Sequence, residues 1–302
     1  MINQAGSGCP EYDREWQLGE AAKDAGDLAL ARHHYAASGA AAERAGCDEL
    51  RERALCNEAA VAFELGDIDG LVPELRQVLM RNLSTVNTFL AAKNIARGYE
   101  LRREHKKGLF YARIALSRAE ALDRPEWTAA AVNQIGNCLL GDSMFADAAR
   151  SYRDALELVP SEDTSRAMIY QANLGYCEVV LGRARHGLRI LYQCLRAARR
   201  EGWRRLEMIA RIDLCFAHLE LGRLRDAERQ GRRGLALAEV SGEHDWVKNA
   251  LYLLGEVAVL GGATEEGRSR FGELQRRFYP DQPYLSDFLV GVDVRGLINL
   301  RA

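Results

Sequence analysis

The chain repeats a pattern of about forty residues along almost its whole length. Seven times, a small residue is followed seven positions later by a turn residue, and five positions after that by a second small residue. A fixed period of this size predicts a stacked repeat array, which grows by one supersecondary unit at a time and needs no single deep core. The turn residues, spaced 40, 37, 40, 39, 40 and 40 residues apart, are Gly26, Gly66, Arg103, Ser143, Gly182, Gly222 and Gly262.

Each repeat is predicted to contain two antiparallel helices. In the fourth repeat, apolar residues recur at helical spacing over residues 126–140 and again over 145–158, on either side of a turn at 141–143. Small residues at two fixed positions allow two helices to cross closely, and a turn glycine supplies the left-handed backbone that ends the first helix. The first position holds Gly19, Ala59, Ala96, Gly136, Gly175, Cys215 and Gly255, and the second holds Ala31, Leu71, Gly108, Ala148, Gly187, Ala227 and Gly267.

This pattern resembles the tetratricopeptide repeat (TPR) superfamily over residues 14–280. Repeat two departs from it most, with Leu71 at a small position and Pro73 early in the second helix, and repeat three lacks a turn glycine. The resemblance implies an all-α, right-handed superhelical solenoid of seven helix-turn-helix repeats. The long period is similar to TPR variants of bacterial regulators and signalling adaptors. The matching residues of repeat four are Ile135, Gly136, Leu139, Phe145, Ala148, Tyr152, Ala155 and Pro160.

The two ends differ from the repeats. Residues 1–13 are polar and glycine-rich, and we expect them to be flexible. Pro280 and Pro283 break the array, and residues 281–302 carry apolar residues at helical spacing, which predicts a capping helix over the last repeat. A docking helix for a partner is the alternative.

In the TPR fold the first helix of each repeat lines the concave side. The position two residues before the first small residue then holds an amide or acidic side chain in six of seven repeats. An amide both donates and accepts, so a ladder of amides could bond the backbone of an extended peptide. Nearby Lys93 and Arg97 could hold a carboxylate. The predicted peptide-binding residues are Arg53, Asn57, Lys93, Asn94, Arg97, Asn133, Gln134, Asn137, Asn173, Tyr176, Asp213 and Phe216.

A polar concave face also has a simpler interpretation. It needs no ligand, because side chains there can be solvated or can bond to neighbouring helices. Tyr176 and Phe216 favour binding, since aromatic side chains on a wet inner wall usually contact something. They could equally pack between repeats.

An arginine-rich run from Arg183 to Arg233 is predicted to lie mainly on second helices, on the convex side. Residues 75–235 carry 28 basic and 18 acidic side chains, whereas residues 1–74 carry 6 and 15. The preferred interpretation is a solvated face with helical partners such as Asp226 and Glu228. An acidic protein partner and, less favoured, nucleic acid are the alternatives.

Composition and motifs argue against an enzyme. The six histidines have no second ligand one helical turn away, every glycine is explained by a turn or a crossing, and no nucleophile elbow or phosphate loop is present. We therefore expect no cofactor, no metal and no membrane partner. Seven cysteines without a C-x-x-C pair indicate reduced, mostly buried residues of a cytoplasmic protein, and 36 arginines against 5 lysines favour a bacterial source.

The prediction is a non-enzymatic module that holds a peptide or an extended segment of a partner protein in its concave groove, as an adaptor or regulator. The alternative is a self-assembling scaffold, including a homo-oligomer, or a protein that docks partners through the arginine-rich convex face. The charge asymmetry along the chain could serve either kind of assembly.

Overall fold

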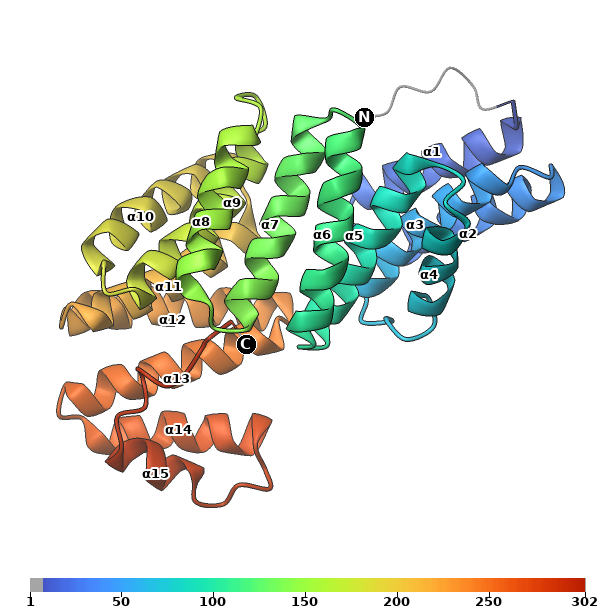
Figure 1. The fold of residues 1–302 in the computed structure, drawn as a ribbon. Coiled ribbons are helices and arrows are strands. Elements are labelled where there is room, and N and C mark those ends of the chain that lie inside the picture. The colour runs from blue at the N-terminus through green and yellow to red at the C-terminus, as the bar shows by residue number, and fades with distance from the viewer. Residues whose placement is uncertain (1–7, 302) are drawn as a thin grey trace. The chain divides into compact units, whose positions relative to one another are not determined.

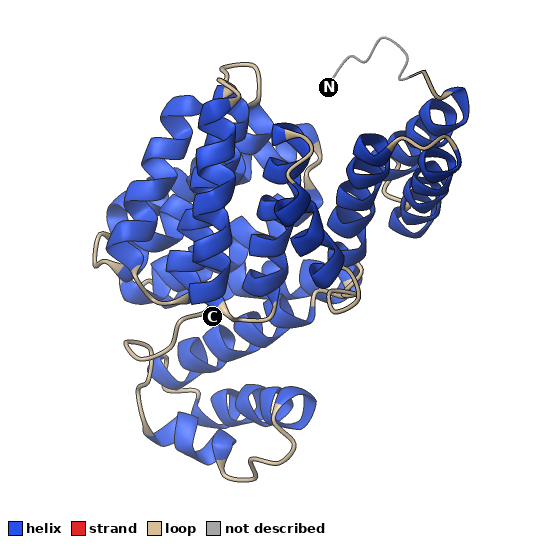
Figure 2. Ribbon diagram, turned by 45° about the vertical axis from the view of Figure 1, so that its right-hand side comes forward, coloured by secondary structure: helices blue, strands red, loops and turns tan. Residues whose placement is uncertain are grey.

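The computed structural model describes residues 8–301, and within them all regular structure is α-helical (Figure 2). The all-α prediction is confirmed. Fifteen helices follow one another in the described chain, as seven consecutive pairs and one short final helix (Figure 1). No described helix is long and apolar enough to cross a membrane.

The chain divides into two compact units, Met1–Asp142 and Ser143–Ala302, a division that the periodicity did not predict. It falls in the turn of repeat four, so the two helices of that repeat belong to different units. The first unit contains α1 (Pro10–Asp24), α2 (Leu28–Arg44), α3 (Asp48–Glu64), α4 (Val72–Arg81), α5 (Thr85–Leu101), α6 (His105–Ala121) and α7 (Pro125–Gly141). The second contains α8 (Phe145–Leu158), α9 (Thr164–Val180), α10 (Ala184–Glu201), α11 (Arg204–Glu220), α12 (Leu224–Ser241), α13 (His244–Leu260), α14 (Thr264–Phe278) and α15 (Leu285–Gly291).

The turn register predicted from the sequence is correct at all seven positions. The five turn glycines have φ between 68° and 86°, and Arg103 and Ser143 adopt the same left-handed conformation at φ 60°. This conformation ends each first helix and reverses the chain, and it is strained for a residue with a Cβ atom. The repeat geometry therefore persists even where the sequence lacks glycine.

In several repeats the small residues lie where the two helices cross, as expected. A Cβ atom added at Gly187 of α10 would lie 2.7 Å from the carbonyl oxygen of Gly175 of α9. One at Gly267 of α14 would lie 3.1 Å from the carbonyl oxygen of Gly255 of α13. Backbone atoms cannot yield at such distances, so side-chain bulk at these crossings would push the helices apart.

Within each unit, the first helices of successive repeats form an inner layer. In the first unit α5 contacts both α3 and α7, and in the second unit α11 contacts both α9 and α13. The second helices α2, α6, α10 and α12 each pack between the first helix of their own repeat and that of the next, as α6 does with α5 and α7. The predicted binding residues all lie on these inner-layer helices.

Repeat two is irregular for a reason visible in its sequence. Pro73 is tolerated only in the first turn of a helix, and α4 accordingly begins at Val72 and spans only ten residues. Leu71 lies just before this helix and is buried, so it does not occupy a helix crossing and need not be small.

Both predicted ends need correction. Residues 10–13 are helical rather than flexible, because α1 begins at Pro10 and Tyr12 packs in a buried cluster with Cys9 and Ala54. Residues 1–7 of the predicted flexible terminus lie outside the described residues. The predicted helix over 281–302 is wrong in extent, since α15 covers only Leu285–Gly291. The chain from Val292 onward is extended or turned, and it runs back along α13 (Figure 1).

Candidate functional site

The first unit contributes eight of the predicted binding residues, and several of them bond to neighbouring helices. The Asn94 side-chain amide on α5 donates to the carbonyl oxygen of Cys56 on α3 at 2.6 Å. Gln134 on α7 donates to Glu100 on α5, also at 2.6 Å. Both side chains are buried, so these two amides join one repeat to the next instead of facing solvent.

The basic residues of the first unit are also engaged. Arg53 is buried and its Nε donates to Asn87 at 2.6 Å. Arg97, which we expected to hold a ligand carboxylate, pairs with Glu100 at 2.5 Å. The positive charge of Arg97 thus already faces a carboxylate of the same helix. The half-buried remainder of the predicted set in this unit comprises Asn57, Lys93, Asn133 and Asn137.

In the second unit, two of the four predicted residues, Tyr176 and Asp213, contact a segment of the chain itself. Asn173 and Tyr176 lie on α9, and Asp213 and Phe216 lie on α11. The Tyr176 and Phe216 rings are 5.9 Å apart and both are buried. The segment that contacts this wall is residues 293–301, which we call the return segment because it runs back from α15 (Figure 1).

The inner wall holds both backbone polar groups of Leu300. The Leu300 N–H donates to the Tyr176 hydroxyl oxygen at 3.1 Å, and the Asn249 side chain of α13 donates to the Leu300 carbonyl oxygen at 2.6 Å. The Tyr176 hydroxyl in turn donates to Asn299 at 3.3 Å, and Asn299 donates to Ser143 at 3.1 Å. These contacts bind a non-helical backbone through side chains, as was predicted for the amide ladder, but they come from Tyr176 and Asn249, which lie outside the ladder position.

The adjoining arginine side chain enters a charged aromatic pocket. Arg301 Nη2 lies 2.5 Å from Asp213 Oδ2, and its guanidinium lies 4.3 Å from the centre of the Trp246 ring and 4.9 Å from that of Tyr176. A guanidinium over aromatic faces beside a carboxylate combines cation–π attraction with a charge-assisted hydrogen bond. Burial raises the pKa of Asp213 to about 6, although Arg301 lowers it.

A second arginine of the return segment faces acidic side chains farther along the same wall. Arg295 lies 3.5 Å from Glu220 of α11 and 3.6 Å from Glu256 of α13, and it also pairs with Asp293 at 2.6 Å. Burial, with the neighbouring Asp293 charge, raises the pKa of Glu256 to about 7. The second unit therefore presents acidic groups toward the two basic side chains of this segment.

This wall also contains Trp246, Glu220 and Glu256, which were not predicted from the sequence. Trp246 precedes the matched positions of repeat seven, and extending the same helical face one turn toward the start of α13 would have found it. The acidic pair gave no such signal, because its role depends on a segment that folds back from another part of the chain.

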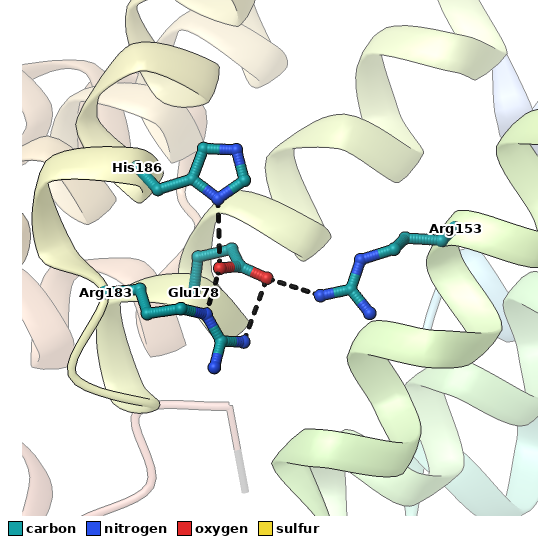
Figure 3. A network of polar contacts seen from close by, with 4 residues as sticks. All are labelled: Arg153, Glu178, Arg183 and His186. Atoms are coloured by element: carbon teal, nitrogen blue, oxygen red, sulfur yellow. Dashed lines mark hydrogen bonds and ion pairs between the residues drawn. The ribbon is translucent and has the colours of Figure 1, made fainter.

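A separate polar network in the second unit centres on Glu178 of α9 (Figure 3). Its buried carboxylate pairs with Arg153 of α8 at 2.7 Å, with Arg183 at the start of α10, and with His186 Nδ1 at 3.1 Å. The hydrogen bonds from Arg183 are the main reason that the pKa of Glu178 falls to about 2, against the opposing effect of burial. This carboxylate joins three helices and uses its acceptor positions within the fold.

Several residues of the arginine-rich run have helical partners, as its preferred interpretation predicted. Arg229 pairs with Asp226 and Arg232 pairs with Glu228, both at 2.6 Å. Arg205 pairs with Glu243, also at 2.6 Å. Other members of the run, such as Arg189 and Arg196, are exposed on α10.

Among residues 8–301, no group of three or more histidine, cysteine or acidic side chains is placed to hold a metal ion. His218 is buried and its Nε2 lies 2.8 Å from the Tyr192 hydroxyl, so it is a core histidine, as the sequence indicated. All seven cysteines are free, and six are buried.

Comparisons with known proteins agree with this architecture. The sequence matches no protein-family model and no curated protein. Among solved structures, the apo form of RapI has 10% identity and a TM-score of 0.65, covering 96% of this chain and 84% of its own. A Rap protein complexed with competence and sporulation factor has 17% identity and the same TM-score, with coverage of 96% and 78%. A tetratricopeptide repeat protein from Parabacteroides merdae has 17% identity and a TM-score of 0.55, with coverage of 93% and 98%.

At these identities the likeness concerns the fold. It extends over nearly the whole chain and agrees with the seven turn positions and the close helix crossings described above. The protein therefore has the helical repeat fold of the tetratricopeptide repeat superfamily.

Proposed function

We propose that the protein is a non-enzymatic regulatory or adaptor module that binds an extended segment of a partner protein on the inner faces of its first helices. The proposal includes a bacterial, cytoplasmic setting, which the arginine-rich composition and the free cysteines favour. Fold alone does not imply this role, because one fold serves many functions. The support comes from the chemistry of the inner wall.

The observation that carries the proposal is that side chains of the inner wall bind both backbone polar groups of Leu300. An inner wall built from Tyr176 and Asn249 bonds the N–H and C=O of one residue of a non-helical segment. Such contacts do not depend on the identity of the bound side chain, so the same wall could hold a foreign backbone. The complex of a Rap protein with competence and sporulation factor, a protein of similar fold, adds support.

In the first unit, fewer residues are proposed as ligand contacts than the sequence predicted. Asn94 and Gln134 bond within the fold, so they act as supports for the wall rather than as ligand contacts. Half-buried Asn57 and Lys93 remain as proposed contacts for a partner. Self-association and docking through the arginine-rich face stay predictions, and the ion pairs of Arg229 and Arg232 weaken the second of them.

Site-specific photo-crosslinking in the native host would test the proposal. A photoreactive amino acid would replace Asn57 or Asn173 on inner-layer helices, and Arg189 on the exposed face of α10 would serve as the control position. We expect the two inner positions to capture the same partner protein, and the control position to capture none of it. Capture of a partner only from the position of Arg189 would refute binding on the inner wall.

A further inference from the structure

The return segment makes contacts that differ from those of a cap. A capping segment covers apolar surface with its own apolar side chains, and α15 does so by burying Leu289 near α14. The return segment instead leaves Leu297 85% exposed and Ile298 38% exposed, while its arginine at 301 is largely enclosed. Its position is therefore determined mainly by polar recognition, although Val294 is buried.

The polar contacts come from three successive repeats and converge on two residues. Tyr176 of α9, Asp213 of α11 and Asn249 of α13 each contact Leu300 or Arg301. One residue thus supplies the backbone contacts and the next supplies the charged side chain. Bound peptides are held in the same way: main-chain hydrogen bonds give affinity, and a side-chain pocket gives specificity.

We infer that the return segment is a resident ligand of the second unit, and that a partner binds this wall by displacing it. The partner then carries the same chemistry: an extended segment with an arginine that enters the pocket between Trp246, Tyr176 and Asp213. Arginine fits better than lysine, because a planar guanidinium can stack on both rings while donating to the carboxylate. The inference rests on the proposed function and names its ligand class and its regulation.

The first part of the test measures whether the segment is docked, without any added ligand. The Leu300 amide proton is bonded to Tyr176, so its hydrogen exchange in the full chain should be slowed relative to a free peptide. Arg301→Ala should remove much of this protection, whereas Leu297→Ala, at an exposed position, should leave it unchanged. Exchange of the Leu300 amide at the free-peptide rate in the wild type would overturn the inference.

The second part adds a probe in trans. A fluorescently labelled, amide-capped peptide that copies residues 293–301 is titrated into the full-length wild type, Arg301→Ala and Leu297→Ala proteins. An occupied site lowers apparent affinity by the fraction of molecules that are open, so we expect the Arg301→Ala protein to bind at least about tenfold more tightly than the wild type. The Leu297→Ala protein should bind like the wild type, and a probe ending in alanine instead of arginine should lose binding to every protein.

The outcomes separate this inference from the proposed function. Equal probe affinity for wild type and Arg301→Ala, or no binding to Arg301→Ala, would overturn the resident-ligand inference. Equal binding of the arginine and alanine probes would overturn the arginine pocket. None of these results would affect partner capture from the positions of Asn57 and Asn173, which tests inner-wall binding by itself.

Discussion

Replacement of Glu178 by glutamine should destabilise the second unit in a way that depends on pH. The substitution keeps the shape of the side chain and removes its charge from the network with Arg153, Arg183 and His186 (Figure 3). The Glu178 side chain is only 1% exposed, so water cannot replace the lost partners easily. The effect should therefore exceed that of an exposed ion pair.

The size of the effect follows from the pKa of Glu178. The network lowers this pKa from 4.5 to about 2. At roughly 1.4 kcal/mol per pKa unit, the shift corresponds to about 3 kcal/mol of stability at neutral pH. The positive partners are each about half exposed and are screened by solvent, so we expect a measured loss of about 1–3 kcal/mol.

The sign of the pH dependence is fixed by the direction of the shift. A carboxyl with a lowered pKa in the folded state stabilises the fold above its ordinary pKa of 4.5, and this stabilisation disappears as the pH falls toward 2. The difference between the wild type and Glu178→Gln in the free energy of unfolding should therefore be full at pH 7. It should shrink to less than half by about pH 3.

Urea-induced unfolding followed by circular dichroism would measure this difference, with hydrogen exchange of α9 and α10 to localise it in a chain of two units. Glu157→Gln, which removes an exposed carboxylate from α8, is the matched control and should change stability by less than about 0.5 kcal/mol. The reasoning would be refuted if Glu178→Gln behaved like this control at pH 7. A difference from the wild type that stayed constant between pH 7 and pH 3 would refute it equally.

Three further substitutions test the repeat geometry, each by urea-induced unfolding. Gly255→Ala should lower the free energy of unfolding by about 1–3 kcal/mol, because the new Cβ atom would lie 2.3 Å from the fully buried ring of Phe271. The control Gly291→Ala, whose Cβ atom would have no other atom within 4 Å, should leave the free energy of unfolding unchanged. Asn94→Ala should cost about 1 kcal/mol by removing the interhelical hydrogen bond to the Cys56 carbonyl, which keeps only its bond within α3, and no measurable loss would contradict the interhelical role of this amide. Arg103→Gly should stabilise the first unit by up to about 1 kcal/mol, since glycine adopts φ 60° without strain, and destabilisation would show that another interaction of the arginine dominates.

The local structure of this protein could be read from its sequence because local signals determine it. The forty-residue period, the turn positions and the small residues depend on contacts within one repeat, where close backbone approach restricts the side chain. The turn conformations of Arg103 and Ser143 were predictable for the same reason, since their neighbours in the period are glycines. The two ends were harder. The apolar spacing over residues 281–302 suited a helix, yet most of that region is not helical.

The tertiary structure alone decided how the polar inner wall is used. Asn94 and Gln134 lie at the predicted ladder position and Asn249 lies one helical turn before it in its own repeat, but the first two bond to adjacent helices and the third bonds to the return segment. A side-chain hydrogen bond depends on which acceptor the fold brings near, and Tyr176 meets Leu300 across 124 positions of sequence. Periodicity predicts which face a residue occupies, because that is a property of one helix. It carries no information about a distant segment that folds back onto that face, and here that segment contacts the wall where the sequence predicted a peptide.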